Sequence, residues 1–155
     1  MAADLTIGAT APAFTLPDET GRTISLKDFR GQQLVLYFYP KDDTPGCTKE
    51  ACAFRDVHAM LQKRGAAVLG VSLDGQTAHQ KFKTKYTLPF PLLSDPDATV
   101  SKAYGVYKLK NLYGRKSWGI ERSTFVIDPT GRVQACFRKV KVDGHIDEVL
   151  AALKA

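Results

Sequence analysis

The order of apolar and polar residues predicts buried strands that alternate with amphipathic helices. Leu34–Tyr39 are six consecutive apolar residues, three of them aromatic. This length and composition favour a strand that is buried on both faces. A second apolar run, Ala67–Leu73, predicts another such strand. Between them, Pro40–Gly46 is a stretch rich in proline, aspartate and glycine, residues that break regular structure.

A helical pattern follows that stretch, from Cys47 to a point near Gly65. Phe54, Val57 and Leu61 lie on one stripe of the predicted helix. A strand, a helix and a strand in this order predict a parallel, right-handed unit. Open α/β sheets place their sites at the carboxyl ends of such strands. The pattern therefore brings Cys47 to the place where a functional site is expected.

Shorter patterns complete the expected fold. Near the amino terminus they predict a small hairpin with a turn at Asp18–Gly21 and one helical turn capped by Ser25 and Asp28. In the middle they predict a helix over Thr77–Tyr86 and a helix with Asp95 as cap and Pro96 as first residue. Towards the carboxyl end they predict strands at Ser123–Ile127 and Val133–Phe137 around a turn at Asp128–Gly131, and a last helix marked by Ile146, Val149, Leu150 and Leu153. This order resembles a thioredoxin-like α/β fold: a central mixed β-sheet flanked by helices, with an N-terminal β-hairpin extension. We expect one domain over residues 1–155, because no repeat or boundary interrupts the pattern.

Composition and charge narrow the class of protein. The chain is 44% apolar, which indicates a globular protein, and no apolar run approaches the length of a membrane span. The start, MAADLTIGATAP, lacks the basic and apolar regions of a signal peptide. Three cysteines do not form a secreted disulfide framework, so we expect a cytoplasmic protein whose thiols are kept reduced.

The net charge of +6 raises the alternative of a nucleic-acid-binding protein. The best candidate segment is Lys102–Arg122, in which Tyr107, Tyr113 and Trp118 interleave with cations. Aromatic side chains interleaved with cations can bind single-stranded nucleic acids, because the rings stack on the bases and the cations attract the phosphates. No nucleic-acid-binding motif accompanies them, so we interpret the segment as a solvated, mobile loop that helps to attract acidic partners, and we predict no nucleic-acid partner.

The predicted position of Cys47 changes the chemistry of its thiol. Unpaired N–H groups and the helix dipole at a helix start favour a thiolate, which is the nucleophilic form of cysteine. Thr44 offers a hydroxyl donor from the same loop. The alternative is a passive, buried thiol, and position alone leaves both interpretations open.

A second cysteine, Cys52, follows five residues later in the same predicted helix. The two Cα atoms would lie about 8.7 Å apart on an ideal helix, whereas a disulfide needs roughly 4.4–6.8 Å. Either these cysteines never pair, or the first helical turns unwind when they do. The second option describes a redox switch, in which Cys52 condenses with an oxidised Cys47.

The spacing of Pro40, Thr44 and Cys47 matches the Pro-x-x-x-Thr-x-x-Cys motif of peroxiredoxins. The stretch TPGCTKEAC resembles the bacterioferritin-comigratory-protein (PrxQ) branch of that family, and the stretches GATAPAFTLPD, GIERSTFVID and KVDGHIDEVLAAL extend the resemblance over nearly the whole chain. In this family Cys47 would be the peroxidatic cysteine, Thr44 and Arg122 would orient the peroxide, and Pro40 would shield the thiolate. Cys52 would be the resolving cysteine.

The resemblance implies a thiol-dependent peroxidase of the atypical 2-Cys type, which reduces hydrogen peroxide and organic hydroperoxides to water and alcohols. Some members of the branch carry the resolving cysteine on a later helix, but Thr77–Tyr86 contains no cysteine. Thioredoxin or a similar dithiol would regenerate the enzyme. Members of this branch are often monomers, so we expect a monomer. We also predict no cofactor and, because the apolar runs are short, no membrane partner.

Peroxide reduction also requires donors for the charge that develops on the leaving oxygen. The helix start, Thr44 and Arg122 are the candidates, and a permanently charged Arg122 would hold Cys47 ionised. The alternative is a structural arginine that pairs with Glu50 or Glu121. A further interpretation is that Glu50 orients the guanidinium of a functional Arg122.

Other polar residues receive simpler interpretations. Cys136 alternates along a predicted strand and is interpreted as passive. His58, His79 and His145 are scattered, and no spacing matches a zinc site, so we predict no metal. Two rival functions remain. A thiol–disulfide oxidoreductase would normally carry Cys-x-x-Cys, which is absent, and a non-enzymatic redox sensor or holdase would use the unwinding to expose apolar surface.

Overall fold

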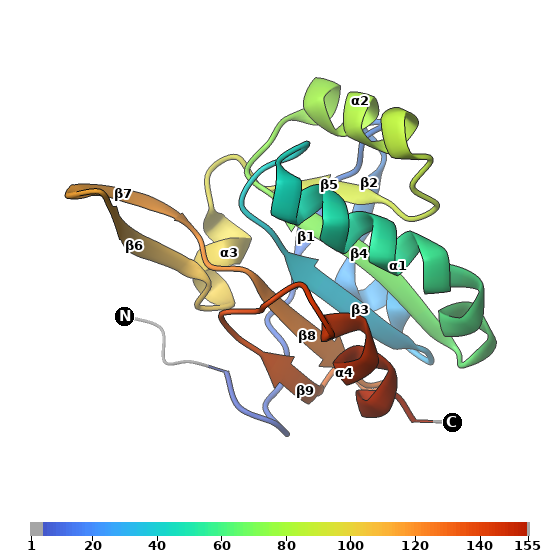
Figure 1. Ribbon diagram of the computed structural model, residues 1–155. Coiled ribbons are helices and arrows are strands. Elements are labelled where there is room, and N and C mark those ends of the chain that lie inside the picture. Colours follow the sequence, from blue (N-terminus) through green and yellow to red (C-terminus); the bar gives the residue numbers. More distant parts are fainter. Residues whose placement is uncertain (1–4, 155) are drawn as a thin grey trace.

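The computed structural model describes residues 5–154 and is built around a five-stranded mixed sheet (Figure 1). The strand order is β5-β4-β3-β8-β9. Strands β3, β4 and β5 run parallel, and β8 and β9 complete the sheet in antiparallel pairings. Their bounds are β3 (Gln33–Phe38), β4 (Ala66–Ser72), β5 (Leu92–Ser94), β8 (Ser123–Ile127) and β9 (Val133–Phe137).

Strand β3 is central because its side chains supply both faces of the sheet with apolar surface. Leu34, Leu36 and Phe38 pack into one apolar cluster, and Val35 and Tyr37 pack into another on the opposite face. Every residue of β3 is buried. The unbroken apolar run read from the sequence is therefore a two-sided core strand, as predicted.

Helices and the amino-terminal segment cover these two faces. The helices are α1 (Pro45–Lys63), α2 (Gln76–Tyr86), α3 (Thr99–Ala103) and α4 (His145–Ala152). Residues of α1, α2 and α4 contribute to the cluster that contains Tyr37, and α1 and α4 lie side by side over the sheet in Figure 1. The other cluster takes side chains from the amino-terminal segment and α3.

The predicted amino-terminal hairpin is present as β1 (Thr15–Pro17) and β2 (Thr23–Ser25), paired antiparallel. It leads into a short 3₁₀ helix, η1 (Leu26–Phe29), where Asp28 accepts a hydrogen bond from the backbone N–H of Ser25. The predicted strands β3, β4, β8 and β9 and helices α1, α2 and α4 also occur, with ends shifted by one or two residues. The predicted α/β class, a mixed sheet flanked by helices, is confirmed.

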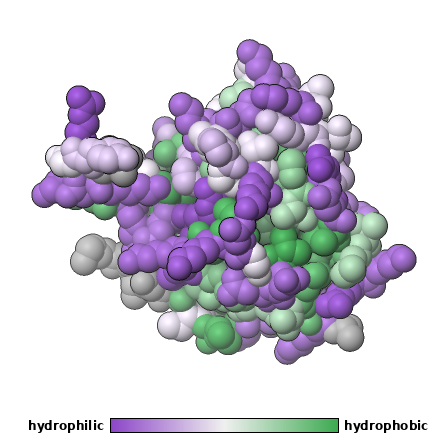
Figure 2. Space-filling model, viewed as in Figure 1, coloured by the Kyte–Doolittle hydropathy of each residue, from purple (hydrophilic) through white to green (hydrophobic). Residues whose placement is uncertain are grey.

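The prediction of a mobile loop between Lys102 and Arg122 is wrong. This segment is a β-hairpin, β6 (Tyr107–Leu112) and β7 (Arg115–Ile120), which projects from the body in Figure 1 and is largely hydrophilic in Figure 2. Tyr113 and Gly114 form its turn with φ values of 52° and 79°, which suits a tight hairpin. Most of β7 is exposed, so its sequence lacks the regular alternation of apolar and polar residues that marks a half-buried strand.

The start of α3 also differs from the prediction. The helix begins at Thr99, because Ala98 adopts a left-handed conformation with φ of 59° and separates the helix from Pro96. Asp95 still acts as a cap: its carboxylate accepts hydrogen bonds from the backbone N–H groups of Val100 and Ser101, at 3.2 and 2.7 Å. Strand β5 was not predicted, since three residues are too few to establish a period.

Two further predictions concern the ends and the surroundings of the chain. The predicted domain and the segment without a signal-peptide pattern both begin within residues 1–4. These residues lie outside the described part of the chain, as does residue 155. Among the helices that the structure describes, none combines the length and the apolar character needed to cross a membrane.

Candidate active site

Cys47 lies in the first turn of α1, as predicted. Thr44 is the N-cap residue with extended backbone angles, and its carbonyl accepts the first helical hydrogen bond from Thr48 at 2.8 Å. Pro45 is the first helical residue, a position where its missing N–H leaves no partner unsatisfied. Cys47 is only 1% exposed. The loop after β3 thus delivers a buried thiol to the positive end of a helix.

Arg122 reaches this thiol from the segment between β7 and β8. Its Nη2 donates a hydrogen bond to the Sγ of Cys47 at 3.3 Å, and its Nη1 donates to Oε1 of Glu50 at 2.7 Å. Cys47 and Glu50 are three residues apart on α1 and therefore share a face. Of the two carboxylates considered as partners, Glu50 is the one that binds the guanidinium. The same arginine contacts the thiol and the carboxylate.

Gly46 makes room for this arrangement. A Cβ atom built on Gly46 would lie 3.1 Å from Nη2 of Arg122, closer than carbon and nitrogen normally approach. The backbone of Gly46 does not have a positive φ. The small residue is therefore explained by the approach of the guanidinium and not by the turn.

The carboxyl group of Glu50 is buried in an apolar setting. Burial raises its pKa from 4.5 to about 7, although Arg122 acts in the opposite direction. Its Oε2 has no hydrogen-bond partner within residues 5–154, and neither has the hydroxyl of Tyr37. Burial, followed by Glu50 and Cys47, raises the pKa of Tyr37 well above its ordinary value. The guanidinium therefore supplies positive charge beside the sulfur in a buried region, where Cys47 and Glu50 are each 1% exposed.

The structure places the other two predicted site residues in the loop before α1. The hydroxyl of Thr44 donates to the carbonyl of Lys41 at 2.9 Å and so is engaged with the backbone instead of the sulfur. Pro40 is partly buried at the start of the loop. The predicted roles of Thr44 in orienting peroxide and of Pro40 in shielding the thiolate remain predictions.

Cys52 is partly buried on the same uninterrupted helix as Cys47, and no disulfide joins any of the three cysteines, all of which lie within the described residues. The two cysteines lie five positions apart on the helix, so a disulfide between them requires the helix to open. Cys136 lies on β9, partly buried against the apolar cluster that contains Phe125.

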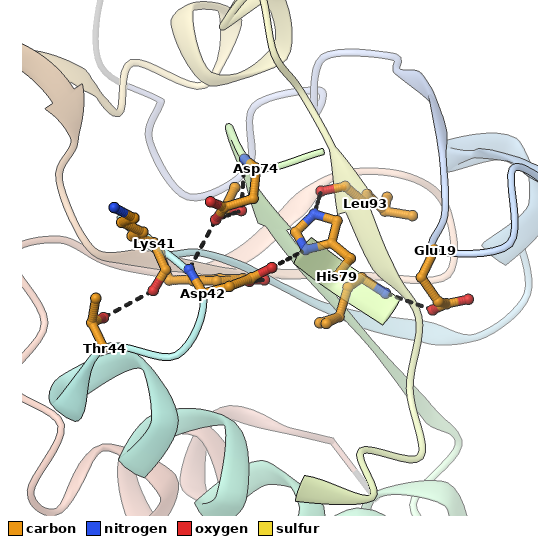
Figure 3. A network of polar contacts seen from close by, with 10 residues as sticks. Glu19, Lys41, Asp42, Thr44, Asp74, His79 and Leu93 are labelled. Atoms are coloured by element: carbon orange, nitrogen blue, oxygen red, sulfur yellow. Dashed lines mark hydrogen bonds and ion pairs between the residues drawn. The ribbon is translucent and has the colours of Figure 1, made fainter. Parts of the chain in front are cut away.

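A buried polar network beside the site was not predicted (Figure 3). Asp42 accepts a hydrogen bond from the hydroxyl of Tyr39 at 2.6 Å, and its second carboxylate oxygen lies 2.6 Å from Nδ1 of His79. The backbone N–H of Asp42 donates to Asp74. Asp42 and His79 are 37 residues apart, and no short motif joins them in the sequence.

Lys110 of the hairpin is a further residue that the sequence did not connect with the site. Burial and the charge of Arg122 lower its pKa, whereas Cys47 and Glu121 act in the opposite direction. The hairpin therefore brings a second cation into the electrostatic neighbourhood of the thiol. Within residues 5–154, no three His, Cys, Asp or Glu side chains gather as metal ligands.

The fold and this geometry define the class of protein: a thioredoxin-like protein with a buried cysteine thiol at a helix start, in contact with an arginine. Comparison with known proteins agrees. A model of the AhpC/TSA family matches residues 7–136. Peroxiredoxin Bcp of Bacillus subtilis is 50% identical over 148 residues, which cover 96% of this chain and 94% of the relative.

Two solved structures show the same likeness. A PrxQ variant from Xylella fastidiosa superposes with a TM-score of 0.91 at 42% identity, covering 97% of this chain and 96% of that one. The bacterioferritin comigratory protein of Xanthomonas campestris gives 0.87 at 45% identity, covering 96% and 94%. The chain belongs to the AhpC/TSA family, within its Bcp/PrxQ peroxiredoxins, an atypical 2-Cys peroxidase group.

Proposed function

We propose that this peroxiredoxin reduces hydrogen peroxide and organic hydroperoxides, with Cys47 as the peroxidatic cysteine and Cys52 as the resolving cysteine. The observation that carries the proposal is the guanidinium of Arg122, which contacts the Cys47 sulfur and the Glu50 carboxylate at once. The Xanthomonas campestris bacterioferritin comigratory protein has alkyl peroxide reduction activity, which supports the same substrate class here.

In the first step the Cys47 thiolate attacks one oxygen of the peroxide. An S–O bond forms, the O–O bond breaks, and the other oxygen leaves as hydroxide or alkoxide and takes up a proton. The sulfur loses two electrons and becomes a sulfenic acid, while the peroxide becomes water or an alcohol. The cation of Arg122 favours the thiolate and stabilises the charge on the leaving oxygen, and Thr44 would orient the peroxide. Pro40 would shield the thiolate from solvent.

In the second step Cys52 resolves the sulfenic acid. The Cys52 sulfur forms an S–S bond with Cys47, the S–O bond breaks, and water leaves with the thiol proton. Since both residues lie on α1, its first turns must unwind before the sulfurs can meet. Breaking that part of the helix also withdraws Cys47 from Arg122.

In the third step an external dithiol, thioredoxin or a similar protein, reduces the disulfide by thiol exchange. A reducing compartment such as the cytoplasm would return Cys47 and Cys52 to thiols between turnovers. We propose that the protein works as a monomer, because both cysteines of the cycle lie on one chain. Sedimentation of the reduced and oxidised forms tests this last point, and a stable dimer in both would contradict it.

Stopped-flow mixing of the reduced protein with hydrogen peroxide tests the function. We expect one fast oxidation, repeated turnover when thioredoxin and its reductase are added, no reaction in Cys47→Ser, and a single oxidation without thioredoxin turnover in Cys52→Ser. A redox sensor or holdase would be oxidised without thioredoxin-supported turnover. A Cys47→Ser protein that still cycles would rule out the assignment.

A further inference from the structure

Two consecutive aspartates attach the loop before α1 to opposite ends of α2. Asp42 pairs with His79 near the start of α2. Asp43 accepts hydrogen bonds from Lys85 and from the hydroxyl of Tyr86, both at 2.9 Å, near the end of α2. We call these contacts the α2 clamp. They hold the residues directly before the Thr44 cap, five and four positions ahead of Cys47.

The inner half of the clamp is buried and fully hydrogen-bonded. The side chains of His79 and Asp42 are 0% and 5% exposed. Nε2 of His79 lies 3.0 Å from the carbonyl of Leu93, which can only accept, so Nε2 must carry a proton. One further proton lies in the 2.6 Å contact between Nδ1 and Asp42. The pair is thus electrically neutral as a whole, which suits its burial.

The loop that the clamp holds is strained. Asp43 has a φ of 57°, a left-handed conformation that disfavours residues other than glycine, although aspartate tolerates it better than most. The strain persists because Asp43 and the residue before it are both fixed. Asp42 is held by Tyr39, Asp74 and His79, and Asp43 itself is held by α2. Releasing either aspartate removes a restraint on the cap of α1.

We infer that the α2 clamp is a brake on the unwinding of α1, and that His79 is the positioning residue that sets it. The inference rests on the proposed function, because unwinding matters only if Cys52 must reach Cys47. While the clamp holds, Thr44 caps the helix and Cys47 stays beside Arg122, ready for peroxide. When the clamp opens, the first turn frays and resolution can proceed.

Two substitutions of His79 separate the clamp from general packing. The amide nitrogen of glutamine can take the place of Nε2, so His79→Gln retains the bond to Leu93 and leaves Asp42 without its partner. The amide nitrogen of asparagine takes the place of Nδ1, so His79→Asn retains the bond to Asp42. His58→Gln makes the same chemical change on α1, at a partly exposed histidine that lies against the ring of Phe90.

The first measurement needs no peroxide. Hydrogen exchange of the reduced protein should be about tenfold faster in the amides of α1 from Thr48 onward, where the helical hydrogen bonds begin, in His79→Gln than in wild type. The reason is that a charge-assisted hydrogen bond of the loop is lost. His79→Asn and His58→Gln should stay near wild type. Equal exchange in His79→Gln and wild type would overturn the inference, whatever the catalytic assays show.

The second measurement follows the two chemical steps by rapid mixing. In His79→Gln we expect disulfide formation to be about tenfold faster, and the rate of oxidation by peroxide to change less than about twofold. The population of a minor unwound form can rise tenfold while the folded form, which reacts with peroxide, still dominates. A smaller share of Cys47 should reach sulfinic acid under excess peroxide. A purely structural role would lower stability without accelerating resolution.

The outer half of the clamp gives an independent test if His79→Gln does not fold. Tyr86→Phe removes only the hydroxyl that binds Asp43 and keeps the ring against Phe82. Exchange of the α1 amides from Thr48 onward should rise two- to fivefold, as expected for one exposed hydrogen bond, and unchanged exchange would overturn the inference. A wild-type protein that forms no Cys47–Cys52 disulfide would refute the proposed function instead, and leaves the exchange result standing.

Discussion

The buried carboxyl group of Glu50 should make the stability of the protein fall as pH rises. Its pKa is 4.5 ordinarily and about 7 in the fold, where burial disfavours the charged form. Between these values the folded protein retains a proton that the unfolded chain has released. The difference of about 2.5 pH units, at about 1.36 kcal/mol each, corresponds to about 3 kcal/mol. That stability is present below pH 4.5 and is lost by the time the pH exceeds 7.

Glu50→Gln tests this reasoning, because an amide of the same shape can still accept from Arg122 and cannot ionise. Urea unfolding of both proteins should be compared from pH 4.5 to 7.5 in a Cys47→Ser background, so that both proteins lack the reactive thiol and cannot be oxidised there during the measurement. The other titrating groups cancel in the difference. We expect the glutamine variant to gain about 3 kcal/mol relative to its parent across this window. A difference that does not vary with pH would refute the account of the buried carboxyl.

Three further substitutions test the packing around the thiol. Arg122→Lys replaces a fork that spans two partners with a single ammonium, and the second-order rate with peroxide should fall by about 10- to 100-fold. Equal rates would show that the guanidinium geometry is unimportant. Gly46→Ala places a methyl group 3.1 Å from Nη2 of Arg122, which should displace the guanidinium. The second-order rate with peroxide should then fall by about fivefold to tenfold, while the free energy of unfolding stays within about 1 kcal/mol of wild type. A wild-type rate would contradict this. Tyr37→Phe removes a buried hydroxyl without a partner in the described residues, so the free energy of unfolding should rise by about 1 kcal/mol, and a clear loss would show that a partner exists.

The sequence predicts the fold best where burial is strongest. Strand β3 is recognisable because both of its faces are buried, and α1 because one face of it packs on the sheet. The β6–β7 hairpin and the short strand β5 lack such a signal, since one projects from the body and the other has three residues. Short or exposed elements leave weak periodicities.

The site was only partly predictable, for a related reason. Local pattern alone places Cys47 at a helix start, whereas the pairing of Arg122 with it was expected only from the resemblance to peroxiredoxins. The contact of Asp42 with His79 joins two ordinary residues from distant parts of the chain. Such a contact follows from the packing of α2 beside the loop, which no local pattern encodes.

The central claim is that peroxide joins Cys47 to Cys52 within one chain. Trypsin makes this directly visible, because cleavage after Lys49 puts Cys47 on the peptide of residues 42–49 and Cys52 on that of residues 50–55. After one equivalent of hydrogen peroxide we expect mass spectrometry to find these two peptides joined by a disulfide, with the Cys136 peptide of residues 133–138 unlinked. A disulfide to Cys136, or a Cys47 oxidised to sulfinic acid while Cys52 remains a free thiol, would contradict the account.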